Sequence, residues 1–188
     1  MRPALVAAIV LTAVATAEGG WSVRREGDVW WLRTPDGARF YSRGVDTVEG
    51  GAGELRRPDR PGFYWQDHFA TVEDFRRWAR DGLVRWGFDT RGGWSDPAPS
   101  MALPYVVELD LGRTAQLHWF DLFAPDAAGN TVAAARRLTA PYRGDPLLIG
   151  YFTDNEVGWW NSPLFGWYLR ARWENHTKRV LWRLVVDH

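Results

Sequence analysis

Two carboxylates and one amide, Asp154, Asn155 and Glu156, follow an apolar run at residues 147–152. A run of this length is typical of a buried strand in a parallel sheet, and the carboxyl ends of such strands carry the active sites of α/β folds. Trp159 lies shortly after Glu156. A carboxyl group can transfer a proton at a glycosidic oxygen, and an indole can stack on the apolar face of a sugar. These residue types favour carbohydrate chemistry, with an ordinary polar turn as the alternative.

The clearest helix of the sequence precedes a second group of polar residues. A capping-box pattern begins at Thr71, apolar residues recur at helical spacing, and Gly87 is expected to end the helix. Residues 88–90 then predict a short strand. The two glycines after it permit a close approach of the backbone. Trp94 and Asp96 are therefore candidates for contact with a substrate.

The N-terminal part of the chain predicts a β-hairpin. Aromatic-rich segments at residues 29–32 and 39–41 flank turn-forming residues at 34–37. Residues 44–48 predict the first core strand, and residues 49–62, rich in Gly, Pro and Arg, predict a long irregular loop. The residues after this loop either line a substrate cleft or cover the edge of the core: Tyr64, Trp65 and His68.

The second half of the chain continues the alternation of strands and helices. Residues 104–111 predict a third core strand, and residues 112–130 predict a long loop that carries the candidate contact residue His118. The apolar run described above is the fourth strand, at 147–153. A loop is expected at 157–166 and helical segments at 131–139, 167–172 and 177–186.

The order of these elements predicts an α/β fold with a parallel sheet. Only the connection between the second and third strands lacks a clear helix. A full (β/α)8 barrel takes about 250 residues. About four core strands are expected here, so the chain is predicted to form a partial (β/α)8 TIM barrel, the first four βα units, preceded by the hairpin.

Four stretches together resemble the agarase-type, β-galactosidase-like retaining glycoside hydrolases with a (β/α)8 barrel. The most specific are Gly-Tyr-Phe-Thr-Asp-Asn-Glu and Gly-Gly-Trp-Ser-Asp. The resemblance runs from about Trp30 to the C-terminus, and its order and spacing fit throughout. The four stretches are residues 41–46, 86–96, 120–125 and 150–156.

The resemblance implies roles for the residues at the end of the fourth strand. Glu156 matches the residue that acts as general acid and then as base, and Asn155 matches one that binds the sugar hydroxyl beside the reacting carbon. An acid must keep its proton near neutral pH, which burial or a neighbouring carboxylate such as Asp154 favours. The nucleophile of these enzymes follows strand seven, so it is expected beyond His188 and remains unidentified.

The sequence gives little support for a metal site, a serine nucleophile or nucleic-acid binding. The histidines show no metal-ligand spacing, and no serine lies in a nucleophile elbow, so neither a metal nor a cofactor is expected. Basic and acidic residues balance at 23 each, which gives no indication of a nucleic-acid partner. Strand periodicity puts Glu108 and Asp110 on one face, with no role assigned. The 13 tryptophans suit both core packing and sugar binding.

Residues 1–17 are typical of a secretory signal peptide. An apolar segment precedes Ala15-Thr16-Ala17, a small-x-small cleavage site. The mature chain is therefore expected to be secreted or periplasmic and to have no membrane contact after cleavage. The predicted division is 1–17 signal peptide, 18–43 hairpin region and 44–188 half barrel.

The sequence thus predicts a glycoside hydrolase acting on a galactose-containing polysaccharide or oligosaccharide such as agar. The chain is expected to be an incomplete, N-terminal fragment without activity of its own. The alternatives are a non-catalytic secreted carbohydrate-binding protein and a non-functional truncated product.

Overall fold

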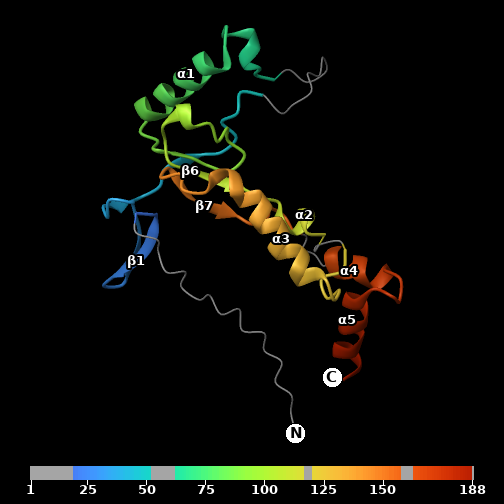
Figure 1. The fold of residues 1–188 in the computed structure, drawn as a ribbon. Coiled ribbons are helices and arrows are strands. Elements are labelled where there is room, and N and C mark those ends of the chain that lie inside the picture. The colour runs from blue at the N-terminus through green and yellow to red at the C-terminus, as the bar shows by residue number, and fades with distance from the viewer. Residues whose placement is uncertain (1–18, 52–61, 117–119, 158–162, 188) are drawn as a thin grey trace. The chain divides into compact units, whose positions relative to one another are not determined.

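The computed structural model describes residues 19–51, 62–116, 120–157 and 163–187. The predicted signal peptide and the candidates His118 and Trp159 lie outside these ranges, as does most of the predicted loop at 49–62. The chain divides into two compact units between Tyr41 and Ser42, and Figure 1 shows the ribbon. Each unit is described by itself.

The first unit is a small antiparallel sheet. Strands β1 (Ser22–Glu26), β2 (Val29–Arg33) and β3 (Arg39–Phe40) follow one another in the order β1-β2-β3. The predicted hairpin of β2 and β3 is confirmed, and β1 is a strand that the sequence analysis missed. The Glu26 carboxylate accepts hydrogen bonds from the guanidinium groups of Arg33 and Arg39, which ties the three strands together.

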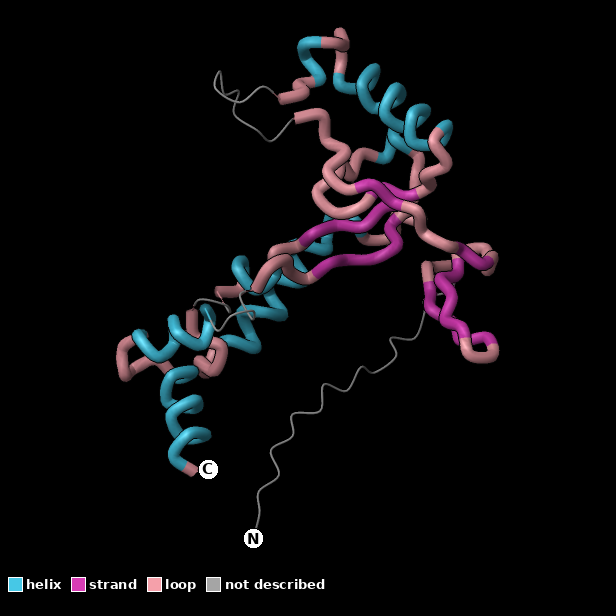
Figure 2. The backbone as a smooth tube through the Cα atoms, turned by 180° about the vertical axis from the view of Figure 1, so that it is seen from behind, coloured by secondary structure: helices cyan, strands magenta, loops and turns pink. Residues whose placement is uncertain are grey.

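The second unit contains the predicted parallel sheet. Its strands β4 (Gly44–Val45), β5 (Thr90–Arg91), β6 (Tyr105–Glu108) and β7 (Leu148–Phe152) pair in sequence order and lie side by side in Figure 2. All four strands are shorter than predicted, and β5 begins two residues later than predicted. After two of the strands a left-handed residue interrupts the extended backbone: Thr47 (φ 60°) after β4 and Asp110 (φ 46°) after β6.

Helix α1 (Val72–Arg85) begins and ends as the sequence predicts. The Thr71 hydroxyl accepts a hydrogen bond from the Asp74 backbone N–H, which satisfies one of the free donors of the first turn. Gly87, with φ 85°, follows the helix end. The inward face of α1 packs with the short 3-10 helices η1 (Trp65–Asp67) and η2 (Pro99–Met101) around a core of Phe75, Ala79 and Met101.

The aromatic residues that follow the predicted loop at 49–62 pack against the core of the second unit. Tyr64 is buried, and Trp65 packs against the core cluster. His68 stacks on Phe63, with ring centroids 4.9 Å apart. Of the two roles that the sequence left open, covering the edge of the core is the one that the structure supports for Tyr64 and Trp65.

Two predicted loops are partly helical, so these predictions were wrong in part. The segment 112–130 contains α2 (Leu111–Thr114) and the first turn of α3 (Ala127–Thr139). The segment 157–166 runs into α4 (Pro163–Arg170), because a proline is well tolerated in the first helical turn. The predicted C-terminal helix is α5 (His176–Val186), and η3 (Ala140–Tyr142) contains the proline that follows α3.

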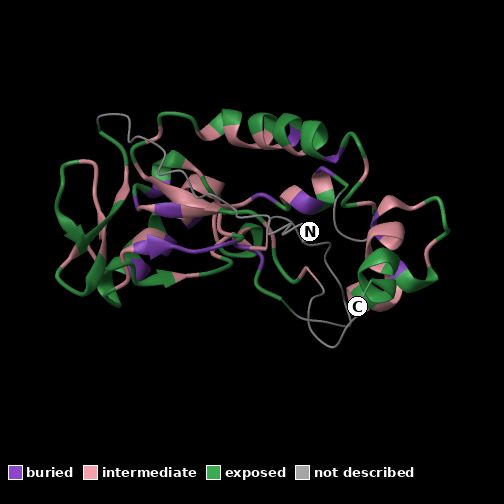
Figure 3. Cartoon of the chain, turned by 90° about the horizontal axis from the view of Figure 1, so that it is seen from below, coloured by how far each residue is buried: buried purple, intermediate pink, exposed green. Residues whose placement is uncertain are grey.

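Burial is uneven over the second unit. Buried residues gather on β5, at the start of β6 and on the inner face of α1, whereas no residue of β4 or β7 is buried and the second half of α5 is exposed (Figure 3). None of the described helices combines the length and the apolar character that crossing a bilayer requires.

Candidate functional site

Strained backbone collects at the carboxyl ends of the parallel strands. Thr47, Trp94, Asp110 and Glu156 all have positive φ, between 46° and 60°, and each lies just past one of the four strands. A left-handed conformation is unfavourable for residues other than glycine and is maintained where a site needs a particular side-chain direction. This edge of the sheet, which we call the strand-end site, therefore comprises the loops after β4, β5, β6 and β7.

Asp154 fixes the loop after β7 to helix α2. Its Oδ1 accepts a hydrogen bond of 2.6 Å from the backbone N–H of Gly112, in the first turn of α2. The backbone N–H of Leu111 donates to the Thr153 carbonyl at 2.7 Å, so the two loops run together beyond the strands. A carboxylate at the N-terminus of a helix is favourable, and Asp154 thus positions the residues that follow it.

Asn155 and Glu156 are exposed at the end of this loop. The left-handed backbone of Glu156 turns the chain sharply at this residue. Both residues follow the anchored carboxylate of Asp154 in sequence, which fixes the start of this exposed turn.

Glu108, the last residue of β6, lies close to the anchored loop. Burial, and then the negative charges of Asp110 and Asp154, raise the pKa of its carboxyl group. Its Oε1 is shielded from solvent and has no hydrogen-bond partner in the described chain. A buried polar atom without a partner is costly, and such atoms are often found at functional sites. The structure thus brings Glu108, Asp110 and Asp154 together.

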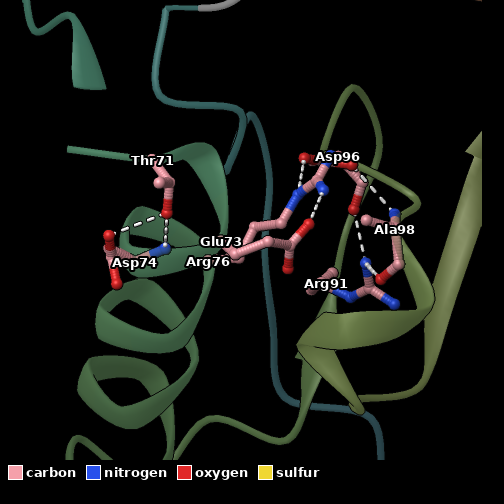
Figure 4. Close-up of polar contacts among 7 residues, drawn as sticks. All are labelled: Thr71, Glu73, Asp74, Arg76, Arg91, Asp96 and Ala98. Atoms are coloured by element: carbon pink, nitrogen blue, oxygen red, sulfur yellow. Dashed lines mark hydrogen bonds and ion pairs between the residues drawn. The ribbon is translucent and has the colours of Figure 1, made fainter. Parts of the chain in front are cut away.

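Asp96, after β5, takes part in an ion-pair network with helix α1. Its Oδ2 accepts a hydrogen bond of 2.7 Å from Arg76 Nε, and its Oδ1 accepts one of 2.9 Å from the Ala98 backbone N–H (Figure 4). Arg76 also pairs with Glu73 on the same helix. The contacts of Asp96 hold the loop after β5 against α1.

Arg91 is a structural residue that sequence reasoning missed. It is fully buried at the end of β5, and its guanidinium donates to the carbonyls of Asp96, Ala98 and Leu103. The group also lies 4.6 Å from the centroid of the Tyr105 ring. Burial lowers the pKa of Arg91, and the carbonyls compensate part of that cost. The buried cation thereby shapes the loop that presents Trp94, which is 48% exposed.

A second organising carboxylate, Asp121, joins segments far apart in the sequence. It accepts hydrogen bonds from the backbone N–H groups of His176 and Thr177, each 2.8 Å long, and from both side chains. Burial alone would raise the pKa of Asp121, but these hydrogen bonds outweigh it and lower the pKa to about 2. The motif at 120–125 therefore has an anchoring role at the start of α5. No cluster of His, Asp or Glu that could hold a metal occurs among the described residues.

Two β-agarases of Vibrio sp. (strain JT0107) are similar to this chain in sequence. β-Agarase B is 33% identical over 94 residues, a match that covers 44% of this chain and 10% of the agarase. β-Agarase A is 34% identical over 91 residues, which covers 40% of this chain and 9% of the agarase. No protein-family model matches. The chain is thus similar to a part of the β-agarases and spans about a tenth of their length.

The fold of this chain is also similar to parts of several solved structures. BpGH50 aligns with a TM-score of 0.58 at 16% identity, over 87% of this chain and 39% of that chain. The agarase AgWH50C aligns at 0.55 and 16% identity, over 74% and 29% of the two chains. An exo-β-agarase aligns at 0.52 and 14% identity, over 74% and 32%. The α/β arrangement described above therefore matches part of these larger chains.

Proposed function

We propose that this chain is part of an agarase-related glycoside hydrolase that acts on a galactose-containing polysaccharide or oligosaccharide such as agar. The observation that carries the proposal is the similarity to two β-agarases. The strand-end site adds a chemical argument, because its loops concentrate carboxylates and strained backbone where parallel sheets carry active sites.

In this proposal Glu156 is the general acid and then the base of a retaining reaction, and Asn155 binds the hydroxyl beside the reacting carbon. Asp154 positions both residues through its hydrogen bond to Gly112. Trp94 is the proposed stacking surface, since it is exposed and held by the loop that Arg91 organises. Asp96, His118 and Trp159 remain candidates for contacts with the sugar.

The proposed setting of this site is a (β/α)8 barrel of which the chain supplies the first four βα units. In support, the parallel strands pair in sequence order and the chain aligns with 29–39% of the solved agarase chains. The nucleophile would come from a later strand, about 5 Å from the acid in a retaining enzyme. Residues 1–17 are proposed to direct the protein to the periplasm or outside the cell.

The test compares two proteins: the 188-residue chain, and the gene product translated as far as its reading frame extends. Both are incubated with agarose-derived hexasaccharide, and the released reducing ends are measured. We expect hydrolysis by the second protein only. Glu156→Gln in that protein should lower the rate by about 10²–10⁴, and by much less on an activated aryl galactoside, which needs no protonation of its leaving group.

Two results would overturn parts of this proposal. Full activity of Glu156→Gln would remove that residue from the mechanism. Hydrolysis by the 188-residue chain itself would contradict the assignment of the nucleophile to a later strand. Binding of the hexasaccharide without hydrolysis by either protein would favour a carbohydrate-binding protein instead.

A further inference from the structure

A cavity of about 370 Å³ opens among the segments that follow β6 and β7. Its volume lies within the range of small-molecule sites, about 300–1,000 Å³. The cavity uses none of the residues proposed above for the reaction. Helices α2, α3, α4 and α5 lie close together in Figure 1. The side chains that matter here come from these helices, from the residues next to their ends and from the segment between α2 and α3: Gln116, Phe120, Asp126, Asn130, Trp167 and Asn175.

The lining has the chemistry of a site for a neutral, hydroxyl-rich ligand. Phe120 and Trp167 contribute aromatic rings, which pack on the C–H groups of sugars. The amides of Gln116 and Asn130 can donate to and accept from hydroxyl groups, with one donor of Asn130 Nδ2 already used in a 3.1 Å hydrogen bond to Asp126. Among the described residues that line the cavity there is no lysine or arginine, while Asp121 and Asp126 contribute carboxylates. A sulfated or carboxylated ligand would be repelled there.

The segment that carries Phe120 is anchored by hydrogen bonds to the start of α5. Asn175 Nδ2 donates to the Phe120 carbonyl at 3.1 Å, and the Phe123 backbone N–H donates to Thr177 Oγ1 at 3.2 Å. Asp121, between them, accepts the hydrogen bonds from the start of α5 already described. A pre-organised wall of this kind reduces the entropy cost of binding.

Helix α2 links this cavity to the strand-end site. Gly112, in its first turn, donates to Asp154, whereas Ala115 and Gln116, directly after its last residue, line the cavity. A helix of this length spans only about 6 Å at 1.5 Å per residue. The cavity lining therefore begins close to the loop that Asp154 anchors.

We propose that this cavity is a second carbohydrate subsite, which holds an uncharged segment of the same galactan chain and discriminates against sulfated galactans. The inference rests on the proposed function for the identity of the polysaccharide. It adds a site that none of the sequence motifs for the reaction includes, and it names neutral galactan as the substrate class.

Calorimetric titration of the 188-residue chain with neoagarohexaose and with a sulfated κ-carrageenan hexasaccharide tests the proposal. We expect the sulfated ligand to bind at least about 10-fold more weakly than the neutral one. Phe120→Ala and Asn130→Ala should each weaken neoagarohexaose binding by about 10-fold, the effect of losing one good contact.

Matched controls separate a lost contact from a lost fold. Phe165 is 42% exposed against 44% for Phe120 but does not line the cavity, and Gln66 is an exposed amide outside it. Phe165→Ala and Gln66→Ala should leave the affinity unchanged. Thermal unfolding of all four variants checks that each is folded. Equal effects of cavity and control variants, or equal affinity for the two hexasaccharides, would overturn the inference.

The outcomes for the two proposals are distinguishable. Unchanged affinity in folded Phe120→Ala, together with Glu156-dependent hydrolysis by the complete gene product, would reject the subsite and keep the proposed function. Cavity-dependent binding of neoagarohexaose without any hydrolysis would support the subsite and reject the hydrolase. Absence of binding by the folded wild-type chain would reject the subsite.

Discussion

At the scale of single residues, the ionisable side chains of Arg91, Asp121 and Glu108 are buried or partly buried. They differ in the hydrogen-bond partners and neighbouring charges that offset the cost of burying them. Three carbonyl oxygens accept hydrogen bonds from the terminal nitrogens of Arg91, whose buried Nε has no partner in the described chain, and Asp121 accepts several N–H and O–H donors. Glu108 instead faces two like charges and has one oxygen without a partner. A buried carboxylate without compensating partners destabilises the fold. Residues that are retained in spite of such a destabilisation are often functional, so Glu108 is the strongest candidate of this kind.

Glu108→Gln should stabilise the second unit at pH 7. Because burial and like charges raise the Glu108 pKa in the folded state, its ionisation opposes folding at high pH; this penalty is absent below the usual value of 4.5. Removing the charge should therefore raise the free energy of unfolding by about 0.5 kcal/mol or more at pH 7, the scale of one like-charge contact, and by little at pH 4. Urea unfolding at both pH values measures this. A destabilised variant at pH 7 would contradict it.

Asp121→Asn should have the opposite dependence on pH. The folded-state pKa of about 2 lies below the usual 3.8, so the charged form stabilises the fold above about pH 4, and this contribution is lost as the pH falls toward 2. Asparagine keeps an acceptor but not the charge. We expect a loss of about 1–2 kcal/mol at pH 7, allowing for partial exposure, that shrinks at pH 3. A difference between wild type and variant that is constant over this range would exclude the carboxylate as its source.

At the scale of elements, the short helix α2 depends on hydrogen bonds to the loop after β7, which is distant in sequence. Helix α2 contains only Leu111–Thr114, too few residues to be stable by itself, and Asp154 satisfies its Gly112 N–H. The stability of α2 therefore indicates whether the loop that carries Glu156 is held in place.

Asp154→Ala should loosen α2, whereas Asp154→Asn should not, because asparagine keeps the accepting oxygen. The expected cost of the alanine variant is about 0.5–2 kcal/mol, as for the loss of a helix cap. Amide hydrogen exchange of residues 111–114 is the direct measurement, and it should accelerate in the alanine variant alone. Equal exchange in the two variants would show that another contact holds the helix.

Sequence patterns within a short segment predicted most helices and strands. They could not predict contacts between residues that are far apart in the sequence. The Thr71 cap and Gly87 gave both ends of α1, and the apolar run gave β7. The predicted loop at 157–166 overlaps the start of α4, because a proline favours a loop in a local pattern but is also tolerated in the first turn of a helix. The order of residues along the chain placed Asp154, Glu156 and Trp94 just after strands. No local pattern, however, indicates that Arg91 is buried or that Asp121 binds the start of α5.

At the scale of the whole molecule, the parallel sheet of the described chain has β4 and β7 at its edges. A largely apolar cavity of about 260 Å³ lies beside β4 and under α1 and includes Trp78 and Trp86. Apolar surface of this kind binds other apolar groups readily.

The chain should therefore bind a hydrophobic dye such as ANS while it retains a cooperative unfolding transition. Trp86 is 67% exposed and lines the cavity, so Trp86→Ala should reduce the fluorescence enhancement by about half or more, since an indole provides much of the contact area. Trp173→Ala, with the side chain 54% exposed elsewhere, is the control and should have little effect. Equal dye binding by wild type and Trp86→Ala would place the apolar surface somewhere else.

The hydrogen bonds between Asp121 and the start of α5 also determine when this part of the protein can form during translation. The partners are separated by 55 residues, and closing so long a loop costs entropy before any contact is gained. Because a nascent chain emerges from its N-terminus, the segment with Phe120 must wait for β7, α4 and the beginning of α5 to leave the ribosome. Helix α1, capped by residues close in sequence, has no such delay. Ribosome stalling after β7 should therefore yield a nascent chain with an ordered α1 and an unanchored 120–124 segment.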